Sequence, residues 1–120
     1  MEKGRGHVNP RQGLAPGLVS EPMNPETHST MAQVRAGVDE IDRQLVALLD
    51  LRFAHMRAAA RIKPDRSAVR DEARKAQVIA NARAEAERLG IPGQIVADLW
   101  EQLVEASIAY EMSEFDRLRD

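Results

Sequence analysis

Two basic side chains continue an apolar helical stripe in the middle of the chain. Arg52 follows Leu45 by seven residues, and Lys63 follows Arg52 by eleven. At about 100° per residue, these spacings place both cations within about 20° of one another and about 16 Å apart along a helix. Because buried cations are costly unless an anion neutralises them, the spacing indicates an anion site. The alternative is that Arg52 pairs with a carboxylate and Lys63 marks an exposed helix end.

Further polar residues occur where helices could bring them to the same place. Ser107 and Glu111 follow Leu103 at intervals of four, so a hydroxyl and a carboxyl extend another apolar stripe. A third segment carries three charged residues within one turn: Asp71, Arg74 and Lys75. Singly, such residues usually form surface salt bridges. Together the groups describe a pocket with several cations and helical walls, which would suit a small dianion.

Arg35 lies 17 residues before Arg52, which is about 25 Å along a helix and about 100° around it. It therefore cannot share one small ligand with Arg52 of the same chain. It could do so only if a second, antiparallel chain supplied it. Taken alone, Arg35 would be an ordinary surface arginine.

The first helix that must position these groups is very long. It opens at a capping box, with Thr30 as N-cap and Gln33 three residues later, and it continues to Pro64. Its apolar residues recur at helical spacing: Val34, Val38, Ile41, Leu45, Leu48, Leu49 and Met56. About 33 residues at ~1.5 Å each give a rod of about 50 Å. The remaining residues could not bury such a stripe alone, so we expect a homodimer.

Two shorter helices follow a polar loop at residues 64–67. We expect the second helix over residues 68–89, ended by Gly90 in the left-handed conformation and by Pro92. Its predicted core residues are Val69, Ala73, Ala76, Ile79 and Ala80. The third helix is predicted from residue 92 or 93 to residue 117, with core residues Val96, Leu99, Trp100, Leu103, Ile108 and Met112. No strand signal occurs, and the fold class is all-α with three helices per chain.

Composition supports one helical domain over residues 30–120. Hydrophobic residues make up 43% of the 120-residue chain, charged residues 30% and aromatic residues only 3%, a mixture that favours helix. Residues 1–29 hold four of the six prolines and four of the seven glycines. Their apolar residues follow no period, so we expect a disordered N-terminal extension. His7 and His28 are too isolated there to indicate a metal site.

Several classes of function are disfavoured by composition. The chain has no cysteine, which excludes disulfides and thiolate metal sites. Its net charge of −2 predicts no bulk attraction to nucleic acid or to an anionic membrane. No apolar stretch approaches the roughly 20 residues of a membrane span, and the N-terminus lacks the apolar middle region of a secretory signal. We expect a cytoplasmic protein.

A set of residues spread over residues 31–111 resembles one enzyme family. These residues are Val34, Arg35, Asp39, Asp42, Leu45, Leu48, Leu49, Arg52, Lys63, Val69, Arg70, Asp71, Arg74, the run Leu89-Gly90-Ile91-Pro92, Ser107, Ile108 and Glu111. Their order and spacing resemble the all-helical chorismate mutase family. The resemblance implies an interlocked dimer of three-helix chains, in which two active sites are each built from both chains.

The resemblance also implies a role for each site residue. Arg52 and the partner chain's Arg35 would bind the two carboxylates of chorismate, and Lys63 would contact the ether oxygen and a carboxylate. Arg74 and Ser107 would complete the carboxylate pocket, Asp71 would receive the ring hydroxyl, and Glu111 would donate a hydrogen bond to the ether oxygen. The reaction to prephenate is pericyclic, so we expect no nucleophile, no metal and no cofactor.

Two positions depart from the best-known bacterial pattern. Lys75 stands where those members carry a glutamate that helps to hold the ring hydroxyl, which leaves Asp71 alone for that role. Glu111 stands where they carry a glutamine, and fungal members resemble this chain in having glutamate there. Only a protonated carboxyl could donate to the ether oxygen.

Three alternatives remain at the level of sequence. Isochorismate–pyruvate lyases share the fold and resemble this chain in Arg35, Arg52, Lys63 and the segment 108–111. Mutases that act on an amino analogue of chorismate are a second enzymatic option. A non-catalytic helical dimerisation module is the third, but it gives no reason for cations along a buried stripe.

Overall fold

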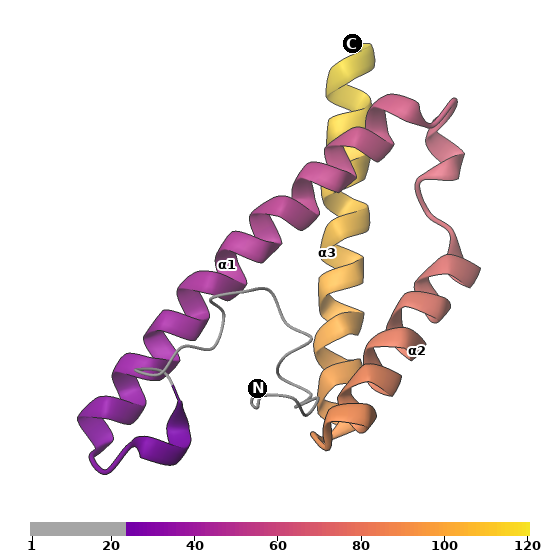
Figure 1. Cartoon of the computed structure of the whole chain (residues 1–120). Helices are drawn as coiled ribbons and strands as arrows, with labels where there is room; N and C mark the ends of the chain where they lie inside the picture. Colours follow the sequence, from indigo (N-terminus) through magenta and orange to yellow (C-terminus); the bar gives the residue numbers. More distant parts are fainter. Residues whose placement is uncertain (1–23) are drawn as a thin grey trace, which may run out of the picture. The chain divides into compact units, whose positions relative to one another are not determined.

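The computed structural model describes residues 24–120, and the secondary structure of these residues consists of helices joined by short connections, without a strand. Three α-helices, α1 (Met31–Ile62), α2 (Glu72–Leu89) and α3 (Gly93–Arg119), are accompanied by two short 3₁₀ helices, η3 (Pro25–Thr27) and η4 (Arg66–Ala68) (Figure 1). The predicted all-α class with one very long helix is confirmed. The chain divides into two units, and the boundary between them falls within the sequence of α1: the first ends at Asp50, and the second comprises Leu51–Asp120.

The first unit contains η3 and residues 31–50 of α1. The predicted capping box is present: the Gln33 amide donates to Thr30 Oγ1 at 3.2 Å, and the Thr30 amide donates to Gln33 Oε1 at 3.0 Å. The predicted disordered extension falls outside the described residues except for 24–29, which include η3 and its Asn24 cap. Along α1, Val38 and Leu45 each expose about half of their surface. The predicted apolar stripe therefore lacks a cover within this unit.

The second helix begins later than predicted. We expected it from residue 68, but residues 66–68 form η4, and α2 begins at Glu72. The cause is Asp71, whose backbone is extended and whose carboxylate accepts the Arg74 amide at 3.0 Å. An aspartate at this position satisfies one of the unpaired amides of a helix start, so it fixes the start there.

A three-residue connection turns α2 back along α3, and Figure 1 shows the two helices side by side. Gly90 has φ of 80°, as its predicted left-handed role requires. Its amide donates to the Glu87 carbonyl at 3.1 Å, and the Ile91 amide donates to the Ala86 carbonyl at 3.0 Å. These bonds close the end of α2 and hold the hairpin.

The core of the second unit is small. Ala60, Val69 and Phe115 form a buried cluster, against which Ile108 and Met112 pack. Three parts of the chain therefore meet here: the end of α1, the η4–α2 connection and the C-terminal half of α3.

Part of the predicted core is wrong. Leu99 is exposed, as are Ala73, Ala76 and Ala80 on α2. The buried line of α3 is instead Ala97, Val104, Ser107, Glu111 and Phe115. Ser107 and Glu111, predicted to extend the apolar stripe, do lie on this buried face, whereas Leu99 does not. On α2, alanines occur on both the exposed and the buried side of the helix, so their spacing does not indicate which side faces the core. No helix among residues 24–120 has the length and apolar character needed to cross a membrane.

Candidate anion-binding site

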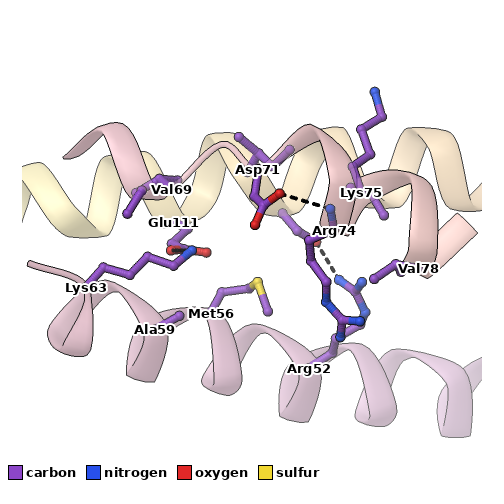
Figure 2. Close-up of a pocket in the computed structure, with 14 residues that line it drawn as sticks. Arg52, Met56, Ala59, Lys63, Val69, Asp71, Arg74, Lys75, Val78 and Glu111 are labelled. Carbon is purple, nitrogen blue, oxygen red and sulfur yellow. Dashed lines mark hydrogen bonds and ion pairs between the residues drawn. The ribbon is translucent and has the colours of Figure 1, made fainter. Parts of the chain in front are cut away.

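A cavity of about 350 Å³ lies in the second unit, between the end of α1, the start of α2 and the middle of α3. Six of the seven predicted site residues line it: Arg52, Lys63, Asp71, Arg74, Ser107 and Glu111. Figure 2 shows the walls from α1 and α2 facing one another, with Met56 between the basic groups. The predicted convergence of these side chains is thus present within a single chain.

Arg52 is held by a hydrogen bond from α1 to α3. Its Nη1 donates to Ser107 Oγ at 2.5 Å, and the Ser107 hydroxyl donates to the Leu103 carbonyl at 2.7 Å. Ser107 is buried. Its hydroxyl therefore has a fixed orientation, with the lone pairs left for the guanidinium. Partial burial of Arg52, and secondly the positive charge of Arg74, lower the pKa of the Arg52 guanidinium from its ordinary value.

Arg74 brings a second guanidinium to the same end of the cavity. Its Nη1 donates to Gln77 Oε1 at 2.6 Å, one turn further along α2, and Figure 2 shows its head group next to that of Arg52. Neither arginine forms an ion pair with a carboxylate of the described residues. Two adjacent cations repel one another unless an anion lies between them. Their juxtaposition is therefore the strongest sign of an anion site, and the carboxylate partner considered for Arg52 is absent from this part of the chain.

The other end of the cavity holds an ion pair. Lys63 Nζ lies 2.6 Å from Glu111 Oε2; the Lys63 side chain is 29% exposed, whereas that of Glu111 is only 5% exposed. A carboxylate at this depth requires a partner, and the ammonium supplies it. Lys63 thus points into the cavity and does not mark an exposed helix end.

Asp71 and Lys75 lie along the α2 wall but differ in direction. One Asp71 oxygen accepts the Arg74 amide, and the other is turned toward the cavity in Figure 2. Lys75 points away (Figure 2), because its ammonium lies 2.7 Å from Glu101 and 2.6 Å from Glu105, both on α3. Lys75 therefore places no charge beside Asp71 within the cavity.

An ion-pair network behind the α2 wall was not predicted. Arg70 binds both Glu105 oxygens, at 2.7 and 3.1 Å. The bonds from Arg70, and then those from Lys75, lower the pKa of Glu105 to about 2. Spacing along α2 indicates only pairs within that helix, whereas the partners on α3 lie 30 and 35 residues away in sequence. The available signal in the sequence was the spacing of Glu101 and Glu105, which places two carboxylates on one face of α3.

The seventh predicted residue, Arg35, lies on α1 in the first unit, where it is exposed, and it does not line this cavity. Within residues 24–120, no cluster of three or more histidine, aspartate or glutamate side chains could hold a metal ion. The chemistry that these groups can supply is the binding of a small dianion by fixed cations, with a lysine and a carboxyl at one end.

A larger, mostly apolar cavity of about 710 Å³ adjoins the first. It shares Arg52, Met56, Arg74 and Val78 with the first cavity. Its remaining wall is formed by the α2–α3 hairpin and includes Leu89, Val96 and Trp100. The two arginines thus stand at the boundary between a polar cavity and an apolar one.

Comparison with known proteins agrees with this geometry. Residues 34–112 match the family model described as chorismate mutase type II. The matched segment contains all seven predicted site residues. The chain is also similar to the isochorismate pyruvate lyase of Pseudomonas aeruginosa, with 27% identity over 95 residues, which cover 79% of this chain and 94% of that protein.

Proposed function

The chain belongs to the chorismate mutase type II family, and on this premise we propose that it converts chorismate into prephenate. The observation that carries the proposal is the pair of adjacent guanidinium groups of Arg52 and Arg74, which have no carboxylate partner among the described residues and share a cavity with Lys63 and Glu111. Chorismate carries two carboxylates and an ether oxygen. Its carboxylates would bind at the end of the cavity that holds the arginines, and its ether oxygen would lie at the end that holds Lys63.

The reaction needs positioning and fixed charge. The ether carbon–oxygen bond breaks as a carbon–carbon bond forms, within one cyclic electron shift, and no proton leaves the substrate. The protein must hold a compact conformer and stabilise the charge that develops on the ether oxygen. A rate gain of about a millionfold corresponds to roughly 8 kcal/mol of differential transition-state binding. Arg52, Arg74 and Ser107 serve the carboxylates, Lys63 serves the ether oxygen, and Asp71 receives the ring hydroxyl.

Glu111 has a role that depends on its proton. In the structure it lies 2.6 Å from Lys63, whereas donation to an ether oxygen requires a protonated carboxyl. In our proposal, substrate draws the Lys63 ammonium toward its own oxygen atoms, and the Glu111 carboxyl is then free to donate to the ether oxygen. We therefore expect the Glu111→Gln protein, whose amide always carries a donor, to be at least as active as the unaltered protein. A large loss of activity in Glu111→Gln would exclude this role for Glu111.

A second copy of the chain completes the proposed site. Arg35 does not line the cavity, and the α1 stripe around it keeps Val38, Leu45 and Leu48 about half exposed. The adjoining apolar cavity, which borders Arg52 and Arg74, would accept such a stripe. We propose a homodimer in which α1 of one chain covers this cavity of the other and brings Arg35 to the substrate.

One observation favours a second candidate reaction. The relative from Pseudomonas aeruginosa is an isochorismate pyruvate lyase, and isochorismate differs from chorismate in the position of its hydroxyl. Lys75 stands where other members carry a glutamate, and its ammonium is turned away toward α3. Asp71 is therefore the one carboxylate that α2 and the residues just before it offer to the substrate ring. An α2 wall with one carboxylate is a weaker basis for choosing between hydroxyl positions than a wall with two.

A single pair of assays tests both candidates. The protein is incubated separately with chorismate and with isochorismate, and the products are identified by chromatography. Prephenate from chorismate supports the mutase, whereas salicylate and pyruvate from isochorismate support the lyase. Arg83→Gln is the matched control for Arg52→Gln, because Arg83 binds Gln94 and does not line the cavity. No product from either substrate would refute both candidates.

A further inference from the structure

The last turn of α3 reaches the end of α1 through Arg119. Its Nη1 donates to the Ala60 carbonyl at 3.0 Å, and its Nη2 donates to the Lys63 carbonyl at 3.0 Å. The guanidinium also lies 3.7 Å from the centre of the Phe115 ring. One planar group thus bridges the Ala60 carbonyl in the last turn of α1 and the Lys63 carbonyl just after that helix, and it stacks on the core of the second unit.

The covalent structure explains why α1 needs an outside donor at this point. In a continuing helix, the Ala60 carbonyl would accept the amide of the residue four positions later. That residue is Pro64, which has no amide hydrogen. Ala60 is fully buried, and a buried carbonyl without a partner is costly. Arg119 supplies the missing hydrogen bond, and its positive charge lies at the negative end of the α1 dipole.

The same contact fixes the backbone of Lys63 on both sides. The Lys63 amide donates to the Ala59 carbonyl at 2.9 Å, and its carbonyl accepts from Arg119. The Lys63 ammonium then meets Glu111, which lies two turns before Arg119 on α3. Both ends of the Lys63 residue are therefore held by the same helix.

We propose that Arg119 is a positioning residue, which sets the direction of the Lys63 side chain in the cavity by bridging the Ala60 and Lys63 carbonyls. Where it concerns turnover, this inference rests on the proposed function. A merely stabilising role would lower the resistance to unfolding but leave the surroundings of the Lys63 ammonium unchanged in the folded protein.

The test compares Arg119→Met and Arg119→Lys with Arg117→Met. Methionine keeps an unbranched stem but offers no donor, and lysine keeps the charge but lacks the planar fork. Arg117 is the matched control, because it lies in the same last turn and pairs with Glu114 at 2.9 Å. All variants are studied below their unfolding transitions, as judged by circular dichroism.

The first readout does not depend on activity. The chain has only three lysines, Lys3, Lys63 and Lys75, so a spectrum of ¹³C-labelled lysine side chains is simple, and Lys63→Met identifies the Lys63 signal. We expect Arg119→Met to move this signal and leave that of Lys75 in place, and Arg117→Met to move neither. An unmoved Lys63 signal in folded Arg119→Met would overturn the inference.

The second readout is turnover of whichever substrate the unaltered protein converts. We expect kcat of Arg119→Met to fall about 10- to 100-fold, the range for a misplacement of up to about 1 Å, with KM nearly unchanged because Lys63 acts on charge that develops in the transition state. Arg119→Lys should restore part of kcat. If Arg119→Met does not fold, Arg119→Lys decides: both readouts equal to those of the unaltered protein would overturn the inference. An unaltered protein without activity would refute the proposed function alone, since the lysine spectrum would still test Arg119.

Discussion

Replacing Lys63 by methionine should destabilise the protein far more than the same change at Lys75. Both ammonium groups lie 2.6 Å from a glutamate, but Glu111 has a 5% exposed side chain and Glu105 a 40% exposed one. Removing one partner of a buried ion pair costs about 3–5 kcal/mol, and because 29% of Lys63 itself is exposed, we expect the lower end, about 3 kcal/mol. For Lys75→Met we expect a much smaller loss, because its carboxylate partners are exposed and such pairs contribute little to stability.

Urea unfolding followed by circular dichroism measures this difference at a fixed protomer concentration, since any self-association would make stability depend on concentration. With a slope of about 1–3 kcal/mol per molar urea, Lys63→Met should lower the midpoint by about 1–3 M. Adding Glu111→Gln to Lys63→Met should recover most of the loss, because the unpaired buried charge is then gone. Equal losses at Lys63 and Lys75, or a double variant no more stable than Lys63→Met, would refute the assignment of this cost to the burial of Glu111.

Three further outcomes are expected. Arg52→Gln should lower kcat/KM by about 100-fold through the loss of a charged contact with the substrate, and an Arg83→Gln protein equally impaired in the same assay would speak against a local effect. Arg70 chiefly holds the pKa of Glu105 at about 2 instead of the usual 4.5. This predicts a contribution to stability that is fully present above about pH 4.5 and is lost as the pH falls toward 2. Urea midpoints across this range should depend less on pH in Glu105→Gln, and an unchanged dependence would contradict the pairing. Asp71→Ala should cost about 1 kcal/mol through loss of the helix cap, whereas Asp71→Asn should keep most of it, and thermal unfolding of the two proteins distinguishes a cap from a general effect of charge.

Local signals in the sequence predicted the elements well. Thr30 with Gln33 marked the start of α1, and Gly90 marked the end of α2, because each acts through hydrogen bonds within a few residues. The start of α2 was wrong by four residues. Alanine at residue 68 favours helix as such, but the carboxylate of Asp71 is the group that satisfies a starting amide.

The site was predictable where helical periodicity decides and not where tertiary contacts decide. Arg52 and Lys63 share a face of α1, and Ser107 and Glu111 lie on the buried face of α3, as their spacing indicated. The direction of Lys75 depends on Glu101 and Glu105 on another helix, and no pattern within α2 contains that information.

Assembly stays a prediction. The length of α1 and its exposed apolar side chains, such as Val38 and Leu45, support a partner chain. Sedimentation of the purified protein measures its mass directly. A monomer at all concentrations would remove Arg35 from the proposed site.

The contact between Arg52 and Ser107 has a consequence for the balance between stability and activity. Folding withdraws the Arg52 guanidinium partly from water and places it near a like charge, and its lowered pKa reflects both effects. Part of the dehydration of this group therefore precedes the arrival of any anion, which favours tight capture but strains the folded state. An apolar residue of similar length would relieve that strain. Arg52→Met should thus yield a protein that resists denaturation better than its parent while binding the anion poorly, as is common where a preorganised site opposes stability.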